Sequence, residues 1–324
     1  MLSQSGDPTQ CAGLFFIGSP LRESLELKPQ HIVLAVLPPL LWATGYSFGK
    51  GALIHFQPLF ATAMTYAVAG AVLFRPASPI RTPWRWLLLI SVIGCSLQSA
   101  LIFSGVALVD TALANLVVQA QVPFAIIAAA LFGLERPNPL RIAGVAVSIL
   151  GIAVVLGSPG SGSSLSGLFL ILAGTASWGI GQALVRRHSR DAINQLIGAT
   201  SLLAALQLLI LSLAVEQDHM YLLATGSAYD WFGVALLGLG AFVAAYLIWY
   251  WLLERNRMDQ VAPFVLLMPL FGMFIGVVFF GETLTSGFIL GSVLVLAGLV
   301  ITLISQGRCT PEDVMPPVRT NARP

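Results

Sequence analysis

Charged residues are scarce in this sequence. Asp, Glu, Lys and Arg together make up 9% of the 324 residues, and the net charge at pH 7 is +2. The basic residues are spread over short polar segments and do not gather into one patch. A nucleic-acid-binding protein needs a basic surface that neutralises many phosphates. The composition therefore argues against a nucleic-acid partner.

Residues for metal, redox or hydrolytic chemistry are equally sparse. Cys11, Cys95 and Cys309 show neither metal-ligand spacing nor an evident disulfide pairing, and the four His are scattered. The metal-binding pattern HExxH is absent, as is the phosphate-binding pattern GxxxxGK[ST]. We therefore expect no enzyme activity, no metal, no cofactor and no direct use of ATP.

Long apolar segments dominate what is present. Hydrophobic residues make up 57% of the sequence, Gly occurs 31 times, and the mean hydropathy is +0.87. A water-soluble protein of this length could not bury so much apolar surface, and a membrane span needs roughly 20 mostly apolar residues. We therefore predict an all-α integral membrane protein with ten transmembrane helices, at Ile32–Lys50, Pro58–Phe74, Trp86–Val109, Thr111–Leu134, Leu140–Gly157, Leu168–Val185, Ile193–Val215, Tyr229–Leu253, Val261–Gly281 and Ser286–Ser305.

The placement of Lys and Arg predicts the orientation of these helices. Short cytoplasmic loops are enriched in both residues. With the N-terminus in the cytoplasm, 15 of the 16 Lys and Arg fall on the cytoplasmic side, and only Lys50 falls on the other. We therefore expect both termini to lie in the cytoplasm. We expect the protein to span the inner (plasma) membrane of the cell.

The membrane pattern occurs twice. Trp42-Ala43-Thr44-Gly45, with Lys50 eight residues after the Trp, returns as Trp178-Gly179-Ile180-Gly181, with Arg186 at the same spacing. Five predicted spans fall in each half, and an odd number of spans gives the second copy the opposite orientation in the bilayer. We therefore predict two inverted five-helix repeats, an arrangement that many secondary transporters share.

The late part of each repeat resembles the EamA modules of the drug/metabolite transporter superfamily. The residues that carry the resemblance to this family are Pro123, Gly133-Leu134-Glu135, Gly144 and Gly151 in the first copy, and Pro269, Gly281-Glu282, Gly291 and Gly298 in the second. Two shorter runs, Leu116–Gln121 and Val261-Ala262-Pro263, are similar to exporters of amino-acid metabolites such as O-acetylserine and cysteine. The resemblance implies the ten-helix fold and an export function.

The polar segments divide the chain. We expect a cytoplasmic N-terminal extension over residues 1–29, a first module over 30–157, a Gly- and Ser-rich linker over 158–165, a second module over 166–305 and a cytoplasmic tail over 306–324.

Amide side chains are the main polar groups inside the predicted spans. Asn115 and Gln119 are four residues apart and share one face of a helix, whereas Gln121 lies on roughly the opposite face. Gln98 and Gln182 add two more amides. Such amides bind solutes in some membrane proteins and join helices by hydrogen bonds in others. Asn115, Gln119, Gln98 and Gln182 are our candidates for solute binding.

Other candidates occur in equivalent positions of the two copies. Trp42 and Trp178 lie near mid-span and are candidates for a pocket wall. Lys50 is a candidate partner for a solute carboxylate, with anchoring at the membrane interface as the alternative. Helix breaks and gating are expected at four further residues: Pro123, Pro269, Glu135 and Glu282.

These features favour a secondary transporter that moves a small polar metabolite, an amino acid or derivative, by alternating access, with export inferred from the resemblance. A drug or hydrophobic-solute exporter of the same fold is the alternative, although an exporter of lipophilic cations would be expected to carry a mid-span carboxylate. A membrane enzyme and a retinal-type receptor lack the residues they need. The expected partners are a solute and membrane lipid, with a homodimer left open.

Overall fold

A computed structural model describes residues 29–157, 164–256 and 258–306 of the chain. The expected N-terminal extension, the C-terminal tail and most of the expected linker lie outside the described residues. Cys11 and Cys309 lie outside them as well.

Within these ranges all regular structure is helical. Nine of the described helices are long and apolar enough to cross a membrane, and a further apolar helix, α2, has 16 residues. The prediction of an all-helical membrane protein is confirmed. In chain order the elements are α1 (Pro29–His55), α2 (Pro58–Leu73), α3 (Trp84–Ser91), η2 (Val92–Leu97), α4 (Gln98–Val106), α5 (Thr111–Val117), η3 (Val118–Ala120), α6 (Gln121–Leu131), α7 (Pro139–Leu156), α8 (Leu165–His188), α9 (Ile193–Val215), α10 (His219–Thr225), α11 (Ala228–Ala235), η4 (Leu236–Ala244), α12 (Ala245–Arg255), α13 (Met258–Val261), η5 (Ala262–Leu266), α14 (Leu267–Phe280) and α15 (Ser286–Gln306).

Several helices begin or end at residues other than the predicted span ends. The first helix runs beyond the predicted span on both sides, to Pro29 and His55. The short helix α10 forms within a segment that we expected to be a loop. Proline at the first helical position starts both α2 and α7, where a missing backbone N–H costs no hydrogen bond.

The two halves share the same irregular segments. The third span carries the π-helical segment η2, and its equivalent in the second half, the eighth span, carries the π-helical segment η4. The fourth span tightens to a 3₁₀ helix at η3, and its equivalent, the ninth span, does so at η5. The duplication seen in the sequence therefore extends to the local backbone geometry.

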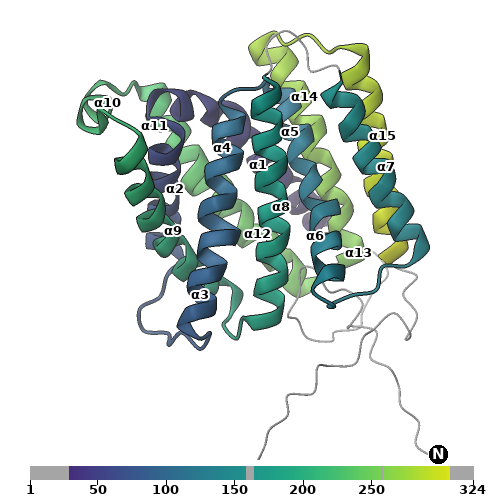
Figure 1. Ribbon diagram of the computed structural model, residues 1–324, viewed down its shortest axis with the longest axis horizontal. Helices are drawn as coiled ribbons and strands as arrows, with labels where there is room; N and C mark the ends of the chain where they lie inside the picture. The colour runs from purple at the N-terminus through teal and green to yellow at the C-terminus, as the bar shows by residue number, and fades with distance from the viewer. Residues whose placement is uncertain (1–28, 158–163, 257, 307–324) are drawn as a thin grey trace, which may run out of the picture.

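Equivalent helices run in opposite directions (Figure 1). The fourth span descends in this view from α5 to α6, whereas the ninth span ascends from α13 to α14. The third span ascends from α3 to α4, whereas the eighth descends from α11 to α12. The helix pairs match this inversion, because α4 of the first half packs on α8 of the second, and η4 of the second half packs on α1 of the first.

The last helices of the two halves, α7 and α15, pack closely through glycines. A Cβ atom added at Gly151 would lie 2.6 Å from the backbone N of Val295 and 2.8 Å from the carbonyl O of Gly291. Backbone atoms of a helix cannot move aside independently, so the glycines set the distance between these helices. The glycines that carry the repeat in the sequence are therefore packing residues.

Gly151→Ala is expected to lower the thermal midpoint of the detergent-solubilised protein by roughly 5 °C or more, because the added methyl group forces α7 and α15 apart. Gly157→Ala is the matched control, since its Cβ would lie no closer than 3.5 Å to any neighbour and its φ of −73° suits alanine. Equal midpoints for the two variants, measured by thermal unfolding, would contradict the close approach of the helices.

Candidate functional site

A central pocket lies among the first, second, third, fourth, sixth, seventh and eighth spans. The space among these residues is about 990 Å³ when the part open to solvent is included. Both halves of the chain contribute lining residues. A solute held there would touch the two repeats at once.

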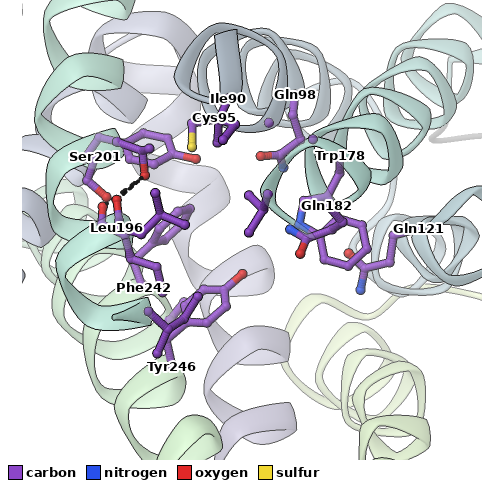
Figure 2. Close-up of a pocket in the computed structure, with 18 of the residues that line it drawn as sticks. Ile90, Cys95, Gln98, Gln121, Trp178, Gln182, Leu196, Ser201, Phe242 and Tyr246 are labelled. Atoms are coloured by element: carbon purple, nitrogen blue, oxygen red, sulfur yellow. Dashed lines mark hydrogen bonds between the residues drawn. The ribbon is translucent and has the colours of Figure 1, made fainter. Parts of the chain in front are cut away.

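Amide groups gather on one side of this pocket. Gln98 from α4, Gln121 from α6 and Gln182 from α8 line it together with Trp178. Figure 2 shows these four side chains on the same side of the open space. Each amide carries both hydrogen-bond donors and an acceptor. This side, which we call the amide face, suits a solute that has polar groups of either kind.

Aromatic rings line the other side. Figure 2 shows Phe242 and Tyr246 across the open space from the glutamines. Tyr246 stacks on Tyr250 with ring centroids 6.0 Å apart, and Trp42 meets Tyr246 edge-on at 5.6 Å. The indole Nε1 of Trp42 donates a hydrogen bond to the Ala241 carbonyl at 3.1 Å, which fixes the ring. We call this side the aromatic face.

None of the described residues that line the pocket is Asp, Glu, Lys, Arg or His. Recognition there depends on amides, hydroxyls, rings and backbone. An ion with a net charge would leave water without a partner of opposite charge, which is costly at membrane depth. The pocket therefore favours a solute without net charge.

The pocket extends toward one end of the bundle. Ile90 near the start of the third span, Val185 near the end of α8 and Ile193 at the start of α9 all line it. This is the end at which the Arg-rich loops join α2 to α3 and α8 to α9, and we call it the basic end.

The opposite end is joined by hydrogen bonds between the halves. The Glu282 carboxylate accepts the backbone N–H of Thr111 at 2.5 Å and that of Ala112 at 2.8 Å. Within the first half, Lys50 Nζ donates to the Val109 carbonyl at 2.7 Å at the same end. Glu282 thus binds the start of the fourth span, where unpaired N–H groups attract a negative charge.

Glu135, the equivalent of Glu282 in the first half, has different partners. Its carboxylate forms ion pairs with Arg141, at 2.7 Å, and with Arg186. These contacts join the end of the fourth span to α7 and α8 at the basic end. The two glutamates that the sequence relates are therefore bound in different ways in this conformation.

Asp191 also joins loops at the basic end. Its carboxylate accepts the backbone N–H of Arg81 at 2.6 Å and that of Thr82 at 3.0 Å. Burial alone would raise the pKa of Asp191, but the hydrogen bonds from Thr82 and Arg81, with the nearby Arg81 charge, lower that pKa below its ordinary value of 3.8. The carboxylate is therefore ionised at neutral pH.

Of the seven predicted solute-binding residues, the structure brings Trp42, Trp178, Gln98 and Gln182 together around the pocket. Three others lie elsewhere, since none of them lines it. Asn115 and Gln119 are fully buried, and Lys50 lies at the opposite end.

Asn115 and Gln119 lie on the face of the fourth span that packs against the ninth span. Asn115 packs on Gly272 of α14, and its Nδ2 donates to Ser47 Oγ at 3.3 Å. Gln119 Nε2 lies 3.5 Å from the carbonyl O of Val265. That carbonyl is four residues before Pro269, which has no N–H to bond it. The pair occupies the seam between spans four and nine.

Pro123 and Pro269 each lie three residues into a helix that follows a 3₁₀ segment. Both are buried. A proline removes one intrahelical hydrogen bond and crowds the preceding turn, which accounts for the tightened backbone at η3 and η5. The prolines therefore mark the points at which the fourth and ninth spans depart from regular α-helix.

Several lining residues were not among the predicted candidates. Gln121 lies on the helix face opposite Asn115 and Gln119, and this difference in face is a sequence signal that could have identified it. Tyr246 lies in a run of aromatic residues near the end of its span, a pattern that is also typical of the membrane interface. Cys95 and Ser201 carry no signal in the sequence that separates them from other small residues of the spans.

Apolar helices around a central pocket whose described lining has no charged side chain define an integral membrane protein with a pocket inside its helix bundle. The chain belongs to the EamA-like transporter family, whose model matches residues 30–157 and 165–304. The family assignment and the transporter class predicted from the sequence are thereby confirmed, and the family is one of transporters and not of enzymes.

Two curated relatives match most of the chain. A protein of Salmonella typhimurium (strain LT2) named "Probable amino-acid metabolite efflux pump" is 32% identical over 280 residues, which cover 83% of this chain and 93% of the relative. A protein of the same name from Escherichia coli (strain K12) is 28% identical over 281 residues, covering 84% and 94%.

A solved structure titled "Crystal structure of protein" has the same fold. It superposes with a TM-score of 0.61 at 21% identity, covering 87% of this chain and 99% of the other.

Proposed function

We propose that this protein is a secondary carrier that exports a neutral amino acid or amino-acid derivative across the cell inner membrane. The observation that carries the proposal is the uncharged pocket, with an amide face and an aromatic face contributed by both halves of the chain. A zwitterion has no net charge, its ammonium and carboxylate groups suit amide partners, and its side chain suits the rings. The names of the two curated relatives support the same substrate class.

Alternating access between two inverted five-helix repeats is the mechanism we propose. The opposite directions of equivalent helices, and the different partners of Glu135 and Glu282, support it. Lys and Arg mark the cytoplasmic side, so we place the basic end and both termini in the cytoplasm. The conformation described then has its pocket directed toward the cytoplasm, the side from which an exporter loads.

The alternative is an exporter of hydrophobic solutes, which the aromatic face favours. Counterflow into proteoliposomes that contain the full chain separates the two. We expect radiolabelled neutral amino acids such as serine, cysteine or phenylalanine to exchange, and lysine, glutamate and the lipophilic cation tetraphenylphosphonium not to. If tetraphenylphosphonium exchanges and none of the amino acids does, the proposal is wrong.

Labelling of Cys95 tests the direction of the pocket. Cys95 is a partly buried free thiol that lines the pocket. In a chain with Cys11→Ser and Cys309→Ser, a membrane-impermeant thiosulfonate should modify Cys95 at least about tenfold faster in inverted vesicles than in right-side-out vesicles. Faster labelling in right-side-out vesicles would place the pocket opening on the other side of the membrane.

A further inference from the structure

A flat ring pair lies at the basic end, outside the pocket lining. The rings of Trp86, in α3, and His188, the last residue of α8, stack with centroids 3.5 Å apart and an angle of 6° between their planes. Trp86 lies two residues after the start of an apolar span, and His188 ends another. The pair therefore lies where hydrocarbon gives way to lipid headgroups, the level that Trp prefers.

Two exposed arginines surround this ring pair. The Arg85 guanidinium carbon is 5.5 Å from the centre of the Trp86 ring, and both Arg85 and Arg187 interact electrostatically with His188. Arg187 Nη1 also donates to the carbonyl O of Phe132, at the end of α6, at 3.2 Å. The cluster thus joins the third, fourth and sixth spans.

The positive charge of this cluster is not paired with a carboxylate in the part of the chain that the structure describes. Over the described residues, no ion pair joins Arg85 or Arg187 to an acidic side chain. The nearby acids are already bound, since Glu135 pairs with Arg141 and Arg186, and Asp191 accepts backbone N–H groups. Two guanidinium groups at headgroup level therefore lack an acidic ion-pair partner among the described residues.

A second Arg–Trp pair nearer the end of the eighth span provides a contrast. Arg255 lies over the ring of Trp251 at 4.2 Å, and its Nη1 is also 3.4 Å from a carboxylate oxygen of Glu254. The ring and the cation are present in both places, but only the Trp251 pair has an acidic neighbour in contact. The chain therefore contains its own control for the effect of unbalanced charge.

We propose that Arg85, Trp86, Arg187 and His188 form a binding site for the headgroup of an anionic phospholipid. The two guanidinium groups would hold the phosphate by charge-assisted hydrogen bonds, and the flat ring surface would support the glycerol backbone. Because α3 and α8 also line the pocket, a lipid at this site would contact both helices on their outer side.

Native mass spectrometry of the detergent-solubilised full chain, titrated with phosphatidylglycerol or phosphatidylcholine, tests this site without any transported solute. We expect the wild type to retain phosphatidylglycerol in preference to phosphatidylcholine. The double variant Arg85→Gln/Arg187→Gln should bind phosphatidylglycerol about tenfold more weakly, since each basic residue near a membrane surface contributes to anionic lipid binding. Arg255→Gln should bind it as the wild type does.

Three outcomes would overturn the proposal. They are equal retention of the two lipids by the wild type, equal phosphatidylglycerol affinity in the wild type and the double variant, and displacement of the lipid by millimolar inorganic phosphate, which would indicate a site for soluble anions. The variant Arg85→Lys/Arg187→Lys keeps both charges and should retain most of the affinity, which separates loss of charge from loss of fold. The assay is independent of transport, so its failure would leave the proposed carrier function untouched.

Discussion

Gln182→Met is expected to raise the half-saturation concentration for solute counterflow roughly tenfold or more. Gln182 lies on the amide face between Gln98 and Gln121 in the pocket lining (Figure 2). Methionine has a similar length but offers the solute no amide donor or acceptor. A hydrogen bond to a charged group contributes about 1.5–3 kcal/mol, and each 1.4 kcal/mol corresponds to about tenfold in affinity.

Gln207→Met is the matched control for this substitution. Gln207 is also a membrane-embedded amide, but it lies outside the pocket lining, and its Oε1 accepts from Ser91 Oγ at 3.3 Å and from Ser96 Oγ. We expect this variant to lower the thermal midpoint and to leave the half-saturation concentration unchanged. If both variants lower only the thermal midpoint, the amide face is a packing feature and does not bind solute.

The sequence predicts more of the fold than of the candidate site. Hydropathy and the repeated motifs are patterns along the sequence, and these lead to the helical membrane fold with two related halves. A pocket depends on the rotation of each helix about its axis, which hydropathy does not fix in a segment that is apolar all round. The π-helical segments η2 and η4 change that rotation within the third and eighth spans.

The amides of the fourth span illustrate this limit. Helical spacing correctly groups Asn115 with Gln119 and separates both from Gln121. It does not tell which of the two faces meets a cavity, and in the structure Gln121 lines the pocket while Asn115 packs on Gly272. Lys50 is a related case, because its partner, the Val109 carbonyl, is 59 residues away and nothing local indicates the contact.

Glu282→Gln is expected to open the end of the bundle opposite the basic end. The carboxylate accepts two backbone N–H groups at the start of the fourth span, and its charge is favourable at a helix N-terminus. A glutamine offers one acceptor oxygen and places an NH₂ group against the second N–H. The loss of one charge-assisted hydrogen bond, about 1.5–3 kcal/mol, shifts a two-state equilibrium by roughly ten- to a hundredfold.

The readout of that shift is the modification of Cys95 in right-side-out vesicles, which we expect to become at least about tenfold faster than in the Cys95-only parent chain. Glu254→Gln is the control, because Glu254 is exposed and pairs with its sequence neighbour Arg255. If Glu282→Gln accelerates labelling from that side and Glu254→Gln does not, the hydrogen bonds between Glu282 and the start of α5 hold that end shut. Unchanged labelling together with a lower thermal midpoint would instead make Glu282 a residue that caps α5 without gating the pocket. The two results separate a carrier that switches by releasing a helix N-terminus from one in which that end stays closed.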